Sequence, residues 1–137
     1  MRSALLLCLL GACAAHRPAA DPRLEWPDGD AQAGREAFRN AGCVTCHLVE
    51  GSGLPAPTIQ PPVPVVFGRR QPSRYDRTYL FRAIVNPDLH IAERHRSASV
   101  TVDGRSRMGD FTRALTVREL IDIVAFLQDA ADRAYEE

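Results

Sequence analysis

The sequence predicts a small all-α domain in which three main helices are joined by long loops. Three segments place apolar residues at helical spacing next to helix-ending signals, and they cover residues 29–41, 76–86 and 116–133. The segments between them are rich in proline and glycine, which oppose long regular elements. We expect this domain to span residues 29–137, after a leader over 1–12 and a tether over 13–28.

The first predicted helix begins after Asp28 or Asp30, since either side chain can cap it, and it ends at Gly42. Gly34 and Phe38 are four residues apart and therefore share one face. A glycine within a helix lowers its stability. Its presence here predicts that another helix crosses closely at this point.

The next segment carries two cysteines and a histidine in the order Cys-x-x-Cys-His, at Cys43, Cys46 and His47. This spacing is typical of covalent haem attachment, with the thiols bound to the porphyrin and the histidine to the iron. A redox dithiol and a zinc site are the alternatives. No strand–helix–strand pattern surrounds the cysteines, as the first would require, and four ligands are not obvious for the second.

Residues 47–70 are predicted to be mostly loop because glycine and proline recur through them. A run of prolines is often a ligand for a polyproline-recognition domain. Beside a haem site, a rigid wall along the edge of the ring is the interpretation that we prefer.

The second helix can be capped by Asp76 or Thr78, and Pro87 stops it. Its apolar stripe consists of Leu80, Phe81, Ile84 and Val85. A long loop follows over residues 88–110, in which the pair Asp103-Gly104 favours a small hairpin.

The last helix has the clearest signals. Thr116 and Glu119 form a capping box. A helical stripe follows, with Phe126 beside it, made of Leu120, Ile123, Val124 and Leu127. We expect this helix to cross the first one at the face that carries Gly34 and Phe38.

A sixth ligand for a haem iron is available at Met108. The chain has two methionines, and Met1 is expected to be lost with the leader. A thioether opposite an imidazole gives a low-spin iron with a raised reduction potential. The alternatives are that Met108 only fills core space, or that His90 or His95 takes the distal position.

The N-terminus has the features of an export signal. A short apolar run over residues 4–10 follows Arg2 and is too short to span a bilayer. The tetrad Leu10-Gly11-Ala12-Cys13 is similar to the lipobox of bacterial lipoproteins, which would leave a lipidated Cys13. Cleavage after Ala14, at an A-x-A site, is the alternative. With Cys8 in the leader, neither route leaves a cysteine pair for a disulfide.

The charges balance, with 17 basic and 17 acidic residues, so the chain lacks the basic excess of a nucleic-acid-binding protein. Prolines in residues 16–28 indicate a semi-rigid tether. Trp26 lies within this tether and either docks on the domain or stays unpacked.

Together these residues resemble class I cytochrome c from about residue 29 to 133. The resemblance rests on the helix pair that carries Gly34, Phe38 and Phe126, and on the haem-attachment motif. It implies that the carbonyl of Pro61 accepts a hydrogen bond from His47, which would orient the proximal ligand. It also implies that Arg69 faces a haem propionate and that Met108 is the distal ligand.

Some features depart from the family pattern. The loop between Pro87 and Met108 is longer than in short members, and Val65 replaces a frequent glycine. No tryptophan lies between Arg69 and Tyr79, and the lysine fringe that some members use for docking is absent. These departures concern partner recognition more than haem binding.

The resemblance implies a monohaem c-type cytochrome that holds one covalent haem c with its iron. An iron with protein ligands on both faces has no open position for a substrate, so we expect an electron carrier rather than an enzyme. We expect redox proteins as partners, a bacterial periplasmic or outer-membrane-side location and a membrane anchor through Cys13. The alternatives are a haem sensor or ligand-binding module with a displaceable Met108, and a permanently docked subunit of an oxidoreductase.

Overall fold

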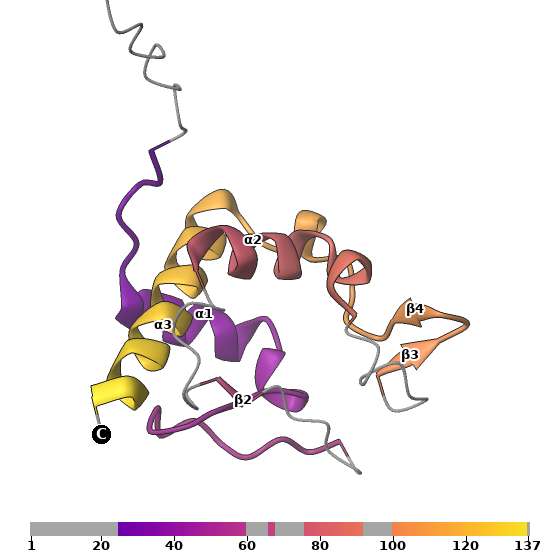
Figure 1. The fold of residues 1–137 in the computed structure, drawn as a ribbon, viewed down its shortest axis with the longest axis horizontal. Coiled ribbons are helices and arrows are strands. Elements are labelled where there is room, and N and C mark those ends of the chain that lie inside the picture. The colour runs from indigo at the N-terminus through magenta and orange to yellow at the C-terminus, as the bar shows by residue number, and fades with distance from the viewer. Residues whose placement is uncertain (1–24, 60–65, 68–75, 92–99, 137) are drawn as a thin grey trace, which may run out of the picture.

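The computed structural model describes residues 25–59, 66–67, 76–91 and 100–136, and these form a mostly helical domain (Figure 1). Three α-helices dominate the described residues: α1 (Ala31–Asn40), α2 (Arg77–Val85) and α3 (Val117–Glu136). The described residues also contain three short 3₁₀ turns, η1 (Cys43–Thr45), η3 (Pro87–His90) and η5 (Phe111–Arg113). Four strands of two residues each lie within the same described ranges: β1 (Leu48–Val49), β2 (Val66–Phe67), β3 (Thr101–Val102) and β4 (Arg105–Ser106). The predicted all-α class is confirmed.

The crossing of α1 and α3 is the main packing contact of the domain (Figure 1). Gly34 is buried at this crossing, where an added Cβ would lie 1.8 Å from the carbonyl oxygen of Asp122 in α3. One turn later, the rings of Phe38 and Phe126 meet edge to face with centroids 5.7 Å apart. The crossing predicted from glycine and aromatic spacing is confirmed.

The helix starts follow the predicted caps. Asp30, rather than Asp28, caps α1 and accepts from the backbone N–H groups of Gln32 (2.8 Å) and Ala33 (3.1 Å). Asp76, rather than Thr78, caps α2. In both cases the capping carboxylate satisfies N–H groups that the first helical turn leaves unpaired.

The capping box at the start of α3 is also confirmed. Thr116 N–H donates to the Glu119 carboxylate at 2.8 Å, and Glu119 N–H donates back to the Thr116 hydroxyl at 3.2 Å. The helix continues to Glu136, beyond the predicted end near Arg133. Because no glycine or proline follows Arg133, the sequence contains no signal that would stop it there.

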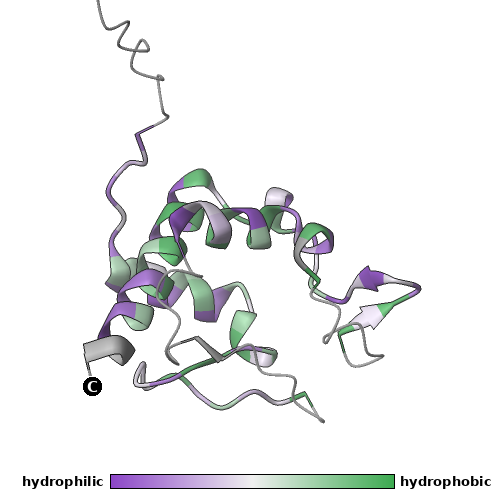
Figure 2. Cartoon of the chain, viewed as in Figure 1, coloured by the Kyte–Doolittle hydropathy of each residue, from purple (hydrophilic) through white to green (hydrophobic). Residues whose placement is uncertain are grey.

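The core lies between the three helices, and apolar residues recur along the ribbon of each one (Figure 2). Helix α3 contributes the largest share, and α2 packs against it through Leu80 and Ile84. The most deeply buried large side chains are Phe126, Leu80, Ile123, Leu127 and Val124.

The two strand pairs differ in how well the sequence predicted them. Strands β3 and β4 form the expected hairpin, in which Asp103 (φ 51°) and Gly104 (φ 75°) both adopt the left-handed conformation of a type I′ turn. Strands β1 and β2 pair in parallel within a segment predicted to be loop. That pairing joins residues 18 positions apart, so no local signal announces it.

The N-terminal segment of the described chain is fastened to the helices. The rings of Trp26 and Phe81 in α2 meet edge to face, with centroids 4.9 Å apart. The carbonyl oxygen of Asp28 accepts from the Arg118 guanidinium at 3.0 Å. Trp26 therefore docks on the domain. The leader, Cys8, Cys13 and most of the tether lie outside the described residues, and within those residues no helix has the length and apolarity to cross a membrane.

Candidate haem-binding site

The haem-attachment motif forms one helical turn directly after α1. Gly42 adopts a left-handed conformation (φ 77°) and turns the chain out of α1 into η1. The N–H of His47 then donates to the carbonyl oxygen of Cys43 at 2.9 Å, which closes a turn over residues 43–47. Residues three and four positions apart lie on one face of such a turn, so Cys43, Cys46 and His47 share a face. The two thiols and the imidazole can therefore meet one flat ligand.

The two thiols differ in exposure. Cys43 is half-buried and Cys46 is exposed, and both are free. Burial raises the pKa of the Cys43 thiol to about 11, so it is protonated at neutral pH. A pair with one thiol against the core and one at the surface suits a planar group that is half inserted into the domain.

The imidazole of His47 is held in its neutral form. Its Nδ1 is buried, its ring lies 6.3 Å from that of Phe38, and burial lowers its pKa to about 4. Because the neutral imidazole is the form that binds a metal, the environment of His47 prepares it for ligation at neutral pH.

The segment after the motif folds back onto it. The N–H groups of Thr58 and Ile59 donate to the carbonyl oxygen of Thr45 at 3.2 and 3.3 Å. The Arg35 guanidinium, which lies in α1 before the motif, donates to the carbonyl oxygen of Ser52 at 2.9 Å. These bonds hold residues 52–59 against the turn and α1. Pro61 and Arg69, predicted to orient His47 and to face a propionate, lie outside the described residues, as does Val65.

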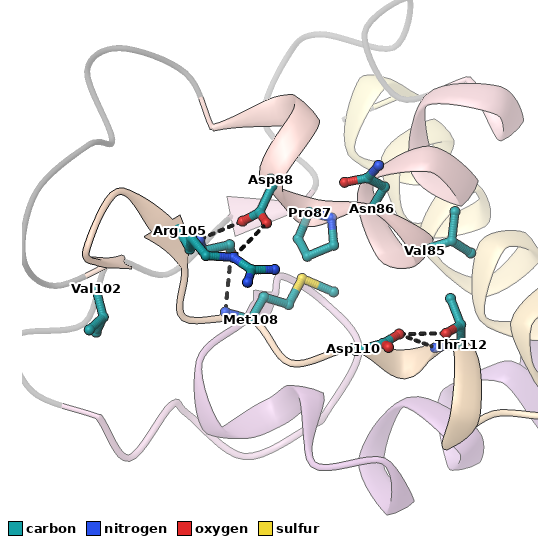
Figure 3. Close-up of a pocket in the computed structure, with 10 residues that line it drawn as sticks. Val85, Asn86, Pro87, Asp88, Val102, Arg105, Met108, Asp110 and Thr112 are labelled. Atoms are coloured by element: carbon teal, nitrogen blue, oxygen red, sulfur yellow. Dashed lines mark hydrogen bonds and ion pairs between the residues drawn. The ribbon is translucent and has the colours of Figure 1, made fainter.

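Met108 lies in the loop between β4 and η5, as its flanking residues predicted. It is half-buried and packs against the core, and its N–H donates to the Ser106 hydroxyl at 3.1 Å. Figure 3 shows its side chain extending into a pocket, with the end of α2 and Pro87 on one side and Asp110 and Thr112 on the other. The pocket has a volume of about 520 Å³. His95, a competing ligand, lies outside the described residues, and the side chain of His90 is not among those described.

Several apolar side chains at the edge of the core are only partly covered. Half-buried side chains from η1, the loop after it, α2 and the segment around η5 pack against the core: Cys43, Val44, Leu54, Tyr79, Phe81, Met108, Phe111 and Leu115. A porphyrin is a large apolar ring that such a surface can cover on both faces. Two thiols, a neutral imidazole, a thioether and half-covered apolar side chains at the edge of the core fit a covalently held haem.

The sequence did not reveal two polar contacts near Met108. Asp88 in η3 accepts from the Ser106 N–H at 2.7 Å and pairs with Arg105 at 3.3 Å. Arg105 and Ser106 lie 17 and 18 positions after Asp88 in the sequence, so neither contact follows from local spacing. The only available signal was an aspartate directly after the helix-ending Pro87.

Comparison with known families identifies the chain. The sequence model of the cytochrome c family matches residues 31–131, which include α1, α2, most of α3 and the haem-attachment motif. No curated protein and no solved structure matches the chain significantly. The match covers more than half of the chain. Members of this family are electron carriers that bind haem c covalently, and Cys43 and Cys46 fit their attachment motif. The chain belongs to the cytochrome c family.

Proposed function

We propose that this protein is a monohaem cytochrome in which Cys43 and Cys46 form the bonds to the porphyrin, and His47 and Met108 bind the iron from opposite faces. The observation that carries the proposal is the single turn that places both thiols and a neutral imidazole on one face. Met108 supports it from a separate loop, since it is a half-buried methionine at the edge of a pocket.

The chain's own residues favour electron exchange over substrate chemistry. The bound haem iron supplies one-electron exchange between its ferric and ferrous states. His47 and Met108 are both uncharged, so neither adds charge that would stabilise the ferric form, and a thioether ligand raises the reduction potential. With both His47 and Met108 bound to it, the iron would have no open position for a substrate. The buried side chains around the crossing of α1 and α3 exclude water from one side of the site.

A spectrum tests the ligand assignment. The oxidised wild-type protein should show the weak near-infrared sulfur-to-iron charge-transfer band, and Met108→Ala should abolish it. Leu89→Ala is the matched control, because it shortens an exposed apolar side chain on neighbouring η3 and should leave the band unchanged.

Three results would contradict this assignment in different ways. A band that persists in Met108→Ala would exclude Met108. A low-spin wild-type protein without the band would point to His90 or His95 as the distal ligand. A high-spin wild-type protein would instead favour the haem sensor or ligand-binding module.

We further propose that the protein is a bacterial lipoprotein, anchored through Cys13 on the outer side of a membrane, where it exchanges electrons with redox proteins. The lipobox-like tetrad that ends at Cys13 supports this. Two or three acyl chains would hold it stably, whereas one would hold it only marginally. Because Trp26 docks on α2, the free tether would run from Ala14 to Glu25. At ~3.1 Å per residue in a polyproline conformation, it would reach roughly 35–40 Å.

Cell fractionation tests the anchor. Wild-type protein should be recovered with membranes, and Cys13→Ser should be recovered in the soluble fraction. A wild-type protein that is wholly soluble and begins at Ala15 would show cleavage at the A-x-A site instead. That result would leave the haem assignment unchanged.

A further inference from the structure

The loop that carries Met108 is attached to the rest of the domain by a short chain of hydrogen bonds that begins at Asp88. Asp88 lies in η3, directly after Pro87, and its Oδ1 accepts from the Ser106 N–H at 2.7 Å. The Ser106 hydroxyl in turn accepts from the Met108 N–H at 3.1 Å. Ser106 is therefore held on one side by Asp88 and on the other holds the backbone of Met108.

The β3–β4 hairpin keeps Ser106 in place for both bonds. Ser106 pairs with Thr101 across the hairpin, and the Arg107 N–H donates to the carbonyl oxygen of Val100 at 2.8 Å. The hairpin is part of the long segment between Pro87 and Met108. A two-stranded hairpin alone is marginally stable in water, so it needs an attachment to a larger element. Asp88 provides that attachment.

We propose that Asp88 is a positioning residue that keeps Met108 at the iron by fixing the β3–β4 hairpin to the end of α2. This inference rests on the proposed role of Met108 as distal ligand. It assigns the attachment to the bond between the carboxylate and the backbone, rather than to the ion pair with Arg105. The Arg105 side chain is 82% exposed and lies 3.3 Å from Asp88, and such surface pairs contribute little.

The Ser106–Asp88 bond has the properties that this role needs. A hydrogen bond from a backbone N–H to a carboxylate is stronger than one between neutral groups. It also lowers the pKa of Asp88 below its ordinary value, so the carboxylate stays charged near neutral pH. The bond is two residues from Met108, so its loss frees the chain directly before the ligand.

Competition with imidazole measures how well Met108 is held. Imidazole binds the ferric iron only when Met108 has left it, so its apparent affinity increases with the fraction of molecules in which the loop is open. Losing the bond to Asp88 in Asp88→Ala should raise the apparent imidazole affinity by about three- to tenfold, because exposure to water reduces the contribution of this bond to that of an ordinary hydrogen bond. The near-infrared band of the imidazole-free variant should weaken or disappear at lower temperature than in the wild type.

Three variants separate this bond from its neighbours. Asp88→Asn retains an oxygen that can accept from Ser106 N–H in a weaker, neutral bond, so its imidazole affinity should lie between those of the wild type and Asp88→Ala. Arg105→Gln removes only the ion pair and should also leave the imidazole affinity unchanged. Asp129→Ala is the matched control, since it removes an equally exposed carboxylate that pairs with Arg133 at 2.9 Å on distant α3.

The outcomes are distinguishable. An imidazole affinity that is the same in Asp88→Ala as in the wild type overturns the proposal, even if urea denaturation shows a less stable domain. If Arg105→Gln raises the imidazole affinity as much as Asp88→Ala does, the ion pair provides the attachment, and the proposal is again overturned. If Asp88→Ala does not accumulate with haem, Ser106→Ala decides, because it removes only the hydroxyl that accepts from Met108. Ser106→Ala should raise the apparent imidazole affinity. An unchanged imidazole affinity in this variant would refute the proposed chain of bonds. A wild type without the sulfur-to-iron band contradicts the role of Met108 itself.

Discussion

Replacing Gly34 by alanine tests the crossing that holds the domain together. A Cβ at this position would lie 1.8 Å from the carbonyl oxygen of Asp122, 2.3 Å from its carbonyl carbon and 2.9 Å from the nitrogen of Ile123. All three atoms belong to the backbone of α3, so no side-chain rotation can relieve the overlap. The closest distance falls short of an ordinary contact at 3.4 Å by about 1.6 Å. The two helices must therefore move apart.

Two opposing effects set the size of the change. Alanine is a better helix former than glycine, which would stabilise α1 by up to about 1 kcal/mol. Overfilling a packed interface costs typically ~1–3 kcal/mol, and a clash with backbone belongs at the upper end of that range. We therefore expect Gly34→Ala to lower the free energy of unfolding by about 2 kcal/mol, which corresponds to a melting temperature roughly 8–15 °C lower.

Thermal and urea denaturation of the haem-loaded protein, followed by far-ultraviolet circular dichroism, measure the effect. Ala33→Gly is the control on the same helix. It lies at an exposed position and should cost only the helix-propensity difference of about 1 kcal/mol. A Gly34→Ala protein as stable as the wild type, or more stable, would refute the close crossing of α1 and α3.

Three further predictions concern the packing and capping of the helices. Trp26→Ala should lower the free energy of unfolding by about 1–2 kcal/mol, because it removes the aromatic contact with Phe81; unchanged urea denaturation would show that the segment is not docked. Asp122→Ala should lower it by about 1–3 kcal/mol, since the buried carboxylate accepts from a backbone N–H at 2.9 Å, and a neutral result in the same assay would exclude this role. The bonds from Thr116 hold the pKa of Glu119 below its ordinary value of 4.5, so the capping box stabilises above that pH and loses its effect as the pH falls through the lowered pKa. Glu119→Gln should therefore show a flatter loss of stability than the wild type in urea denaturation below about pH 4.5, and parallel curves would contradict the linkage.

The features that the sequence predicted well depend on residues close together in the chain. The capping box of Thr116 and Glu119 spans four residues of the sequence, and the haem-attachment turn spans five. The crossing of α1 and α3 is a long-range feature, but it was predictable because Gly34 has no other physical reason to lie within a helix. Local signals of this kind fixed the helix starts to within a residue or two.

The features that were missed depend on contacts between distant segments. The parallel pairing of β1 with β2 and the bond from Ser106 to Asp88 each join residues at least 17 positions apart. The sequence also does not decide whether Trp26 docks, because its partner Phe81 lies far along the chain, in α2. Such contacts arise only once the helices are packed, so periodicity and turn residues carry no trace of them.

The central claim is that one haem is bound covalently to residues 43–47. The most direct test is the mass of the exported protein after denaturation in acid solvent, with the modified peptide located by fragmentation. We predict the mass of the processed polypeptide plus one haem, carried on the peptide that contains Cys43 and Cys46. A polypeptide without haem on this peptide, from which the haem extracts freely, would contradict the claim.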